Sequence, residues 1–276
     1  MKFYLKTKDY SVSKENFELK HDEDFDMLVT YPQPKELAGY YKSDGYISHT
    51  DSKKSIADKL YHVVKSINLK NKLSIVNRHA STKNSLLDIG AGTGDFLQYA
   101  KKHSWKITGI EPSDKARKKA LEKGISLHEC ITDYMEQKYD VITLWHVLEH
   151  IPNLDNQITK LKELLKPDGV LIIAVPNYKS FDAGYYKEHW AAFDVPRHLW
   201  HFSQTSISKL CTQHNFTIEK TYPMLFDAFY VSLLSEKYKN GKQRFIPAFC
   251  VGLWSNLKAL RSGEYSSLIY VIKRAK

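Results

Sequence analysis

The sequence predicts an α/β fold with a doubly wound, mostly parallel sheet of seven strands and helices on both faces. Two observations predict this class. From residue 85 onward, short runs rich in β-branched residues alternate with segments whose apolar residues recur at helical spacing. The first of these runs leads directly into a glycine-rich turn. A length of 276 residues with 42% hydrophobic residues suits one large domain with appendages better than two independent units.

Seven short apolar segments are the expected strands. They span residues 86–89, 106–110, 125–128, 140–144, 170–175, 217–220 and 268–272. Apolar residues from Leu154 to Leu165 recur at helical spacing and stop at the turn of residues 166–169, which predicts a helix between the fourth and fifth strands. Ser203 is expected to cap a further helix, because its hydroxyl can accept a hydrogen bond from a free N–H group of the first turn.

Segments outside this alternation suggest the domain organisation. Residues 1–55 are polar and rich in tyrosine, and we expect them to form an N-terminal extension that acts as a lid. Residues 56–276 are expected to form the main domain. Within it, the irregular, aromatic residues 176–202 and the helix-like residues 223–262 are expected to be insertions on the substrate side, the second as a helical cover.

The net charge and the lengths of the apolar runs indicate which binding partners and which cellular location to expect. The formal net charge is +10, and residues 236–276 hold nine basic and two acidic side chains, away from the aromatic segments. We expect a solvated, lysine-rich surface, with nucleic acid as the disfavoured alternative. No run approaches the roughly 20 apolar residues that span a bilayer, and the first residues lack a secretory signal, so we expect a cytoplasmic protein.

The glycine-rich turn is the most informative segment. The strand of residues 86–89 runs into Gly90, Gly92 and Gly94 and then into a helix, so the backbone can pass close beneath a ligand. The next strand ends at Glu111, where a carboxylate can bind the hydroxyls of a ribose. A nucleotide-like ligand is therefore expected at this turn.

Two kinds of cofactor compete for this turn. A dinucleotide fingerprint needs a small residue where this chain has Asp95, and the carboxylate of Asp88 at the strand tip would repel a pyrophosphate. The same carboxylate would attract a cation. S-adenosylmethionine carries an amino group and a sulfonium and no phosphate, so the turn favours this cofactor over a nicotinamide dinucleotide.

Three motifs together resemble a known family. Asp88-x-Gly90-x-Gly92-x-Gly94, Glu111-Pro-Ser and the segment Asp140–His150 are similar to those of class I S-adenosylmethionine-dependent methyltransferases, in particular the quinone O-methyltransferase-like group. The resemblance covers about residues 85–221. It implies a Rossmann-like methyltransferase fold, S-adenosyl-L-methionine as the cofactor and S-adenosyl-L-homocysteine as the product.

The resemblance also implies a set of cofactor-binding residues. The glycines would lie under the methionine and ribose portions, with Glu111 on the ribose hydroxyls. Asp133, or the backbone near residues 130–131, would approach the adenine, and Trp145 and His146 would close on the methionine end. The full expected set is Asp88, Gly90, Gly92, Gly94, Glu111, Asp133, Trp145 and His146.

Catalytic candidates are histidines that follow strand ends. Methyl transfer from a sulfonium needs in-line positioning, plus a base where the acceptor is a hydroxyl or an acidic C–H group. We select His146, His198 and His201, because imidazole titrates near neutrality. Sugar C-methyltransferases of similar architecture carry a Glu-His pair where this chain reads Arg197-His198. Alternatively, His198 and His201 only hold their loop through hydrogen bonds.

A metal site is weighed and not expected. Glu149-His150 resembles part of the Glu-x-x-Glu-His pattern with which quinone O-methyltransferases and small-RNA 2′-O-methyltransferases hold a divalent cation. His146 replaces the first glutamate of that pattern, and losing a hard oxygen ligand weakens Mg²⁺ binding. Tyr40, Tyr41, Tyr46 and His49 could line the substrate mouth or form the core of the lid.

These observations predict a methyltransferase that acts on an unidentified small-molecule acceptor, with O-methylation favoured. An RNA or protein methyltransferase is one alternative. A non-catalytic module that binds the cofactor or nucleic acid is another. The identity of the acceptor and the oligomeric state stay open.

Overall fold

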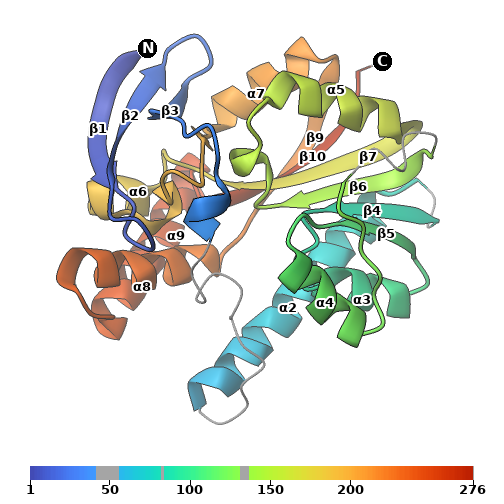
Figure 1. Cartoon of the computed structure of the whole chain (residues 1–276), viewed down its shortest axis with the longest axis horizontal. Helices are drawn as coiled ribbons and strands as arrows, with labels where there is room; N and C mark the ends of the chain where they lie inside the picture. The colour runs from blue at the N-terminus through green and yellow to red at the C-terminus, as the bar shows by residue number, and fades with distance from the viewer. Residues whose placement is uncertain (42–55, 82–83, 131–136, 276) are drawn as a thin grey trace.

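A central six-stranded sheet organises the described part of the chain, which in the computed structural model comprises residues 1–41, 56–81, 84–130 and 137–275. Its strands lie in the order β5 (Lys106–Ile110), β4 (Ser85–Ile89), β6 (Tyr139–Trp145), β7 (Leu165–Pro176), β10 (Ser267–Arg274) and β9 (Phe216–Pro223) (Figure 1). The first four are mutually parallel, and β10 runs antiparallel to both β7 and β9. This confirms the predicted α/β class with a mostly parallel sheet.

One predicted strand is wrong. Residues 125–128 form only an isolated bridge between His128 and Ile110 rather than a seventh strand. After the turn at Gly124, Ile125 is held against α4 (Asp114–Glu122). The N–H group of Ile125 donates to the Ala120 carbonyl at 3.0 Å. The side chain of Ile125 is buried in the helical layer, which leaves His128 alone in position to pair with β5.

Helices cover both faces of the sheet (Figure 1). On one face lie α2 (Ile56–His79), α3 (Asp95–Lys102) and α4. On the other lie α5 (Leu154–Leu164) and α7 (Gln204–Gln213). Strand residues alternate between the two cores, as Val141 packs with the first set and Ile142 with the second. Ser203 caps α7 as predicted, accepting from the Ser206 N–H.

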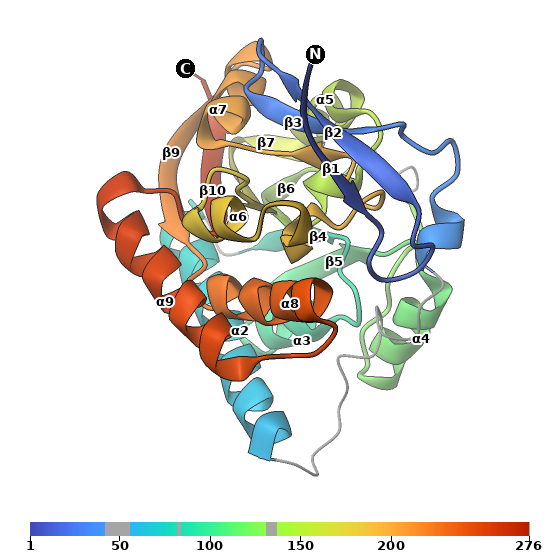
Figure 2. The same ribbon diagram turned by 90° about the vertical axis from the view of Figure 1, so that its left-hand side faces the viewer.

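The N-terminal segment forms a second, antiparallel sheet that we did not expect. Its strands are β1 (Lys2–Lys8), β2 (Asn16–Asp22), β3 (Met27–Tyr31) and the short β8 (Trp200–His201), in that order. β8 belongs to the aromatic insertion, so β3 joins the two segments through the pairs Leu28–His201 and Val29–Trp200. Figure 2 shows this sheet lying across the end of the central sheet.

A third hydrophobic core joins the N-terminal sheet to several other elements. These are η1 (Ala38–Tyr41), α6 (Phe181–Tyr186), η5 (Ala191–Phe193), α8 (Asp227–Asn240) and α9 (Phe245–Ser262). The short η4 (Lys187–His189) follows α6 in the chain, and η3 (Leu148–His150) packs through Leu148 in the core shared with α5. Phe17 of β2, Trp190 of the insertion and Val251 of α9 belong to one buried cluster. We call residues 1–41, 177–202 and 225–262 the cap. Asp182, fully buried, links its parts by accepting hydrogen bonds from Trp190 Nε1 at 2.7 Å and Ser255 Oγ at 2.6 Å.

Among the described helices, none is both long and apolar enough to cross a lipid bilayer.

Candidate cofactor and acceptor site

The glycine-rich turn begins where β4 ends. Gly90, Gly92 and Gly94 have φ angles of +69°, +54° and +73°, a region that residues with a Cβ atom rarely adopt. A Cβ atom at Gly90 would also collide with the side chain of Val147, whereas one at Gly92 would meet nothing within 4 Å. Gly90 is thus required by both conformation and space, and Gly92 borders an open region.

Glu111 connects the ends of two parallel strands. Its Oε2 accepts a hydrogen bond from the Gly92 N–H at 2.9 Å, and its Oε1 accepts one from the Ser113 N–H at 2.9 Å. The predicted ribose-binding carboxylate therefore lies directly beside the glycine-rich turn. Its role in holding a ribose stays a prediction.

Asp88 lies beneath the turn rather than on its surface. Its carboxyl group is 2% exposed and accepts a hydrogen bond from Thr143 Oγ1 at 2.6 Å. Burial raises the pKa of Asp88 to about 7, and the Thr143 hydrogen bond and the charge of Lys72 only partly oppose this effect. Lys72 comes from α2, and nothing in the sequence indicated it. Burial lowers the pKa of the Lys72 ammonium, which lies 4.5 Å from the centre of the Trp145 ring.

Trp145 and His146 lie at the end of β6 but face different partners. Trp145 packs edge to face on Phe96 with ring centroids 5.4 Å apart, and its buried Nε1 has no hydrogen-bond partner within the described chain. His146 adopts a φ of +57°, and its Nε2 lies 3.1 Å from Asp227 Oδ2 at the start of α8. The two residues expected to close on the methionine end therefore have different partners. Trp145 packs within the main domain, whereas His146 pairs with Asp227 of the cap.

Two carboxylates hold the His146 ring. Its Nδ1 lies 3.5 Å from Glu149 Oε1, on the side opposite Asp227. Burial disfavours the charged imidazolium, but the interactions with Asp227 and Glu149 outweigh it and raise the pKa of His146 to about 9. A protonated His146 near neutral pH is a poor proton acceptor, and the ring is better suited to fix its neighbours.

His198 and His201 have separate environments. His198 is partly exposed, and its Nδ1 donates to the Ala192 carbonyl at 2.8 Å, which leaves Nε2 with a free lone pair. His201 is buried, its Nε2 lies 3.0 Å from Thr30 Oγ1, and burial lowers the pKa of its imidazole. Thr30 Oγ1 also donates to the backbone carbonyl of His198 at 2.6 Å. The N-terminal sheet thus supports the loop that carries both histidines.

Arg197 is a buried arginine with several charged and polar partners, and the sequence motifs did not indicate this structural role. It is 1% exposed and pairs through Nη2 with Asp9 Oδ1 at 3.0 Å and with Asp194 Oδ1 at 2.6 Å. Its Nη1 donates to the carbonyl of Tyr40 at 3.0 Å. Burial opposes the ionised carboxyl of Asp9, but the hydrogen bonds from Arg197 and the backbone hold the pKa of Asp9 well below its usual value. Arg197 therefore anchors the N-terminal sheet to the histidine loop.

Glu149, His150 and His198 gather at one point. Their ligand atoms lie within 4.8 Å of one another. Glu149 is 1% exposed, and neither of its carboxylate oxygens has a hydrogen-bond partner in the described residues. His150 Nδ1 donates to the Arg197 carbonyl at 3.0 Å, so its Nε2 is also free of a proton.

This donor set fits a divalent cation. Glu149 is a buried carboxylate whose ion pair with His146, at 3.5 Å, leaves both of its oxygens without a hydrogen bond from the described residues. Histidines that donate one N–H to a backbone carbonyl are typical metal ligands. One oxygen and two nitrogen donors suit a transition metal better than Mg²⁺. The sequence motifs contained both Glu149-His150 and His198, and the structure brings them together, while the expectation of no metal stays a prediction.

The tyrosines of the N-terminal segment have different surroundings. Tyr41 Oη lies 3.0 Å from His150 Nδ1, beside the candidate site, whereas Tyr40 Oη donates to Glu15 at 2.7 Å. Asp133, Tyr46 and His49 lie outside the described residues. Of the aromatic residues in the insertion, Tyr186, Trp190 and Phe193 are buried in the cap core. They therefore stabilise the cap rather than line an open pocket.

Comparison with known proteins identifies the family. A family model described as a methyltransferase domain matches residues 63–221. The chain belongs to the methyltransferase-domain family. The matched region includes the glycine-rich turn, Glu111 and the segment from His146 to His150. Membership confirms the class that the sequence motifs predict.

Curated relatives of this methyltransferase domain match over part of their length. The chain is 38% identical over 106 residues to the ubiquinone biosynthesis O-methyltransferase of Actinobacillus pleuropneumoniae serotype 7, which covers 33% of this chain and 45% of that protein. It is 32% identical over 127 residues to the enzyme of the same name from Pasteurella multocida, covering 38% of this chain and 52% of that protein. The methyltransferase domain thus spans about half the length of these relatives.

Solved structures share the fold. Magnesium protoporphyrin IX methyltransferase from Synechocystis PCC 6803, with bound S-adenosylhomocysteine, aligns with a TM-score of 0.56 at 16% identity, over 86% of this chain and 97% of that one. The cyclopropane synthase MmaA2 from Mycobacterium tuberculosis aligns with a TM-score of 0.51 at 12% identity, over 73% and 82%. At these identities the likeness concerns the fold of the methyltransferase domain alone.

Proposed function

We propose that the chain transfers a methyl group from S-adenosylmethionine to the hydroxyl of a small-molecule acceptor. The observation that carries this proposal is the hydrogen bond between Glu111 and Gly92. It brings a carboxylate suited to ribose hydroxyls against a glycine backbone that borders open space, at the carboxyl edge of a parallel sheet. Membership in the methyltransferase-domain family supports the same conclusion.

The cofactor residues have distinct roles in this proposal. Gly90 and Gly94 hold the turn in its left-handed conformation, while Gly92 and Glu111 meet the ribose. Burial raises the pKa of Asp88 to about 7, and in this proposal a cationic group bound above it favours the ionised carboxylate. Trp145 offers an unpaired indole N–H and an aromatic wall on the methionine side. An adenine contact by Asp133, which lies outside the described residues, stays a prediction from the sequence.

The acceptor is proposed to be a phenolic or catecholic ring. Relatives named ubiquinone biosynthesis O-methyltransferases support O-methylation of such a compound. We propose that residues 1–55 act as a lid over the main domain of residues 56–276, with Tyr41 bordering the acceptor entrance. Cytoplasmic location stays a prediction from the sequence.

His198 is proposed to receive the proton of the acceptor hydroxyl. Its Nε2 has a free lone pair and its ring is partly exposed, as a proton acceptor requires. His201 and His146 are proposed to be positioning residues. His201 acts through Thr30, which also holds the His198 backbone, and His146 holds Glu149.

A bound divalent cation is the second candidate for activating the hydroxyl. The carboxylate of Glu149, which accepts no hydrogen bond from the described residues, favours it, and Glu149, His150 and His198 would hold the ion. When bound, such an ion lowers the pKa of an acceptor hydroxyl as a Lewis acid. His198 would then serve as a ligand instead of the base.

Methyl transfer from labelled S-adenosylmethionine to 3,4-dihydroxybenzoate, total RNA and a protein mixture tests the proposed reaction. We expect label in the catechol only, and a reduction of kcat of about 100-fold in His198→Ala. His189→Ala, which alters a cap histidine outside the cluster, should retain the wild-type rate. Label in RNA or protein but not in a catechol or phenol would contradict the proposed acceptor class.

A further inference from the structure

Helix α9 buries its small residues and exposes its large ones. The side facing the cap core consists of Ala248, Val251, Gly252, Ser255 and Ala259. A Cβ atom at Gly252 would come within 2.8 Å of the Phe229 ring and 3.0 Å of the Ala228 carbonyl in α8. The two helices therefore pack closely through small residues, and most bulky residues of α9 point the other way. Phe249 lies at the edge of this contact, where its ring stacks on Phe229 with centroids 5.4 Å apart.

The outer side of α9 is almost wholly apolar. Its large side chains are between 42% and 80% exposed: Phe245, Ile246, Phe249, Leu253, Trp254, Leu257 and Leu260. At 3.6 residues per turn they cover an arc of about 180° along a helix roughly 27 Å long. Figure 2 shows α9 at the outer edge of the molecule, with no helix or strand of the described residues over it. We call these seven residues the apolar face.

Positive charge borders the apolar face at both ends. Residues 237–262 contain six Lys and Arg residues and no Asp or Glu. Lys242 and Arg244 precede the helix, and Lys258 and Arg261 lie in its last turns. Arg244 approaches one carboxylate, that of Glu236, only at 4.0 Å.

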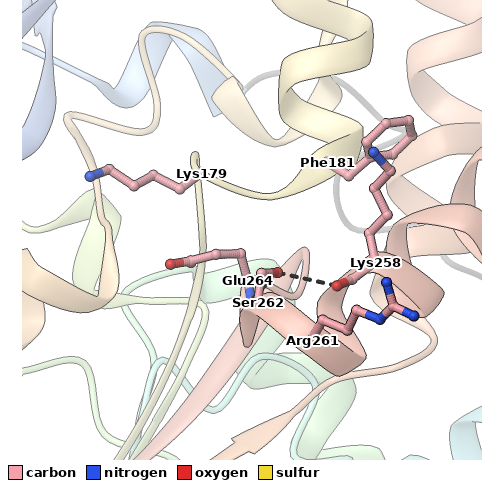
Figure 3. Close-up of a pocket in the computed structure, with 6 residues that line it drawn as sticks. All are labelled: Lys179, Phe181, Lys258, Arg261, Ser262 and Glu264. Carbon is pink, nitrogen blue, oxygen red and sulfur yellow. Dashed lines mark hydrogen bonds between the residues drawn. The ribbon is translucent and has the colours of Figure 1, made fainter.

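A hollow of about 440 Å³ lies at the end of α9 (Figure 3). Lys258 and Arg261 project into it from α9, and Lys179 comes from the insertion. Lys179 pairs with Asp26 at 2.6 Å, but the structure gives Lys258 and Arg261 no carboxylate partner among the described residues. Lys258 lies instead 5.0 Å from the centre of the Phe181 ring. Two cations are thus available beside the apolar face.

We propose that α9 docks the protein on the surface of a membrane containing anionic phospholipids. The apolar face enters the boundary between headgroups and acyl chains, with Trp254 in the interfacial position that this residue type favours. Lys242, Arg244, Lys258 and Arg261 meet the lipid phosphates, each adding electrostatic attraction. This inference does not rest on the proposed reaction.

The charges favour a lipid surface over a second copy of the chain. A symmetric dimer through α9 would bring identical surfaces together. Residues 236–264 hold six basic and two acidic side chains, and one of the two acidic ones, Glu236, is 3% exposed, so each copy would present an excess of positive charge to the other. An anionic bilayer supplies both the apolar medium and the opposite charge.

Co-sedimentation of the full chain with vesicles tests this proposal. We expect binding to vesicles of phosphatidylcholine with 30% phosphatidylglycerol, weaker binding at 0.5 M salt, and at least tenfold weaker binding to phosphatidylcholine alone. Ile246→Gln/Leu253→Gln/Leu257→Gln should reduce binding to the anionic vesicles at least tenfold. Leu121→Gln, at an exposed leucine of α4, is the matched control and should bind as the wild type does.

Two further variants separate the electrostatic contribution to membrane binding from the insertion of the apolar face. Lys258→Glu/Arg261→Glu should reduce binding to anionic vesicles and remove much of its salt dependence. Vesicles should shift wild-type tryptophan emission to the blue, and Trp254→Phe should abolish that shift. Wild-type protein that stays in the supernatant at low salt, or a triple variant that binds normally, would overturn the proposal. So would a wild-type dimer that the triple substitution converts to a monomer, since a second copy would then cover this face.

Discussion

The imidazole rings of His150 and His198 lie edge to face with their centroids 4.6 Å apart, and each donates its Nδ1–H to a backbone carbonyl. Both Nε2 atoms are therefore free beside the buried carboxylate of Glu149. This relationship joins the segment that follows β6 to the aromatic insertion, at the point where we propose that an acceptor hydroxyl is activated.

Addition of Mn²⁺ or Zn²⁺ should raise the unfolding temperature of the protein, because a cation would satisfy Glu149 in the folded state only. Mg²⁺ should have less effect, since two of the three donors are nitrogen. Differential scanning fluorimetry after treatment with EDTA measures this. Glu149→Gln should remove the response, while Glu188→Gln, an exposed glutamate of the cap, should keep it. Equal unfolding temperatures with and without each metal in the wild type would argue for His198 as a base.

Replacement of Arg197 by Met should destabilise the protein by about 3–5 kcal/mol, because it leaves the carboxylates of Asp9 and Asp194 without their buried partner. Urea denaturation measures the free energy of unfolding. Arg244→Met removes an exposed guanidinium and should change it by less than about 1 kcal/mol. A similar small effect at both positions would refute the role of Arg197 as an anchor.

Gly90→Ala should abolish cofactor binding or folding, since it combines a φ of +69° with a collision against Val147. Val147→Ala in the same chain should restore part of the loss by removing the collision while leaving the backbone strain. Gly184→Ala is the control, because a methyl group there meets nothing and φ is not positive. Thermal unfolding of the wild type and the three variants measures their order of stability. A Gly90→Ala protein as stable as the wild type would contradict the requirement for glycine at this position.

The stability of the cofactor-free protein should depend on pH through Asp88. Burial raises its folded-state pKa from the ordinary 3.8 to about 7, so its favourable contribution is complete below about pH 4 and is lost as the pH rises through 7. Asp88→Asn should therefore gain stability relative to the wild type between pH 5 and pH 8, on the order of 1–3 kcal/mol. Urea denaturation at several pH values measures the difference. The stability of Asp168→Asn, which changes an exposed residue of β7, should show the same pH dependence as the wild type, and the same result for Asp88→Asn would contradict the buried state.

Local motifs made the cofactor side of the site predictable. Gly90 and Glu111 immediately follow strands, and the carboxyl ends of parallel strands meet at one edge of the sheet, so their proximity follows from the fold class alone. The helix capped by Ser203 was predictable for the same local reason. His128 shows the limit, since apolar composition predicted a strand where tertiary packing of Ile125 leaves a single bridge.

The proposed acceptor side could not be predicted from the sequence, because it depends on contacts between residues that lie far apart along the chain. Arg197 reads as a substitution in a family motif, yet its partner Asp9 comes from the opposite end of the chain. The alternation of Phe17 and Leu19 was available as a strand signal in a segment that we treated as irregular. On α9, apolar pattern alone would turn the large residues inward, whereas close packing on α8 uses Gly252 and its small neighbours instead.

Calorimetric titration of the protein with S-adenosylhomocysteine tests whether the glycine-rich turn and Glu111 form the cofactor site. We expect one site per chain, at least tenfold weaker binding in Glu111→Ala, and unchanged binding in Glu122→Ala, whose exposed side chain lies at the end of α4. A wild-type protein that releases no heat with S-adenosylhomocysteine but binds a nicotinamide dinucleotide would contradict this assignment.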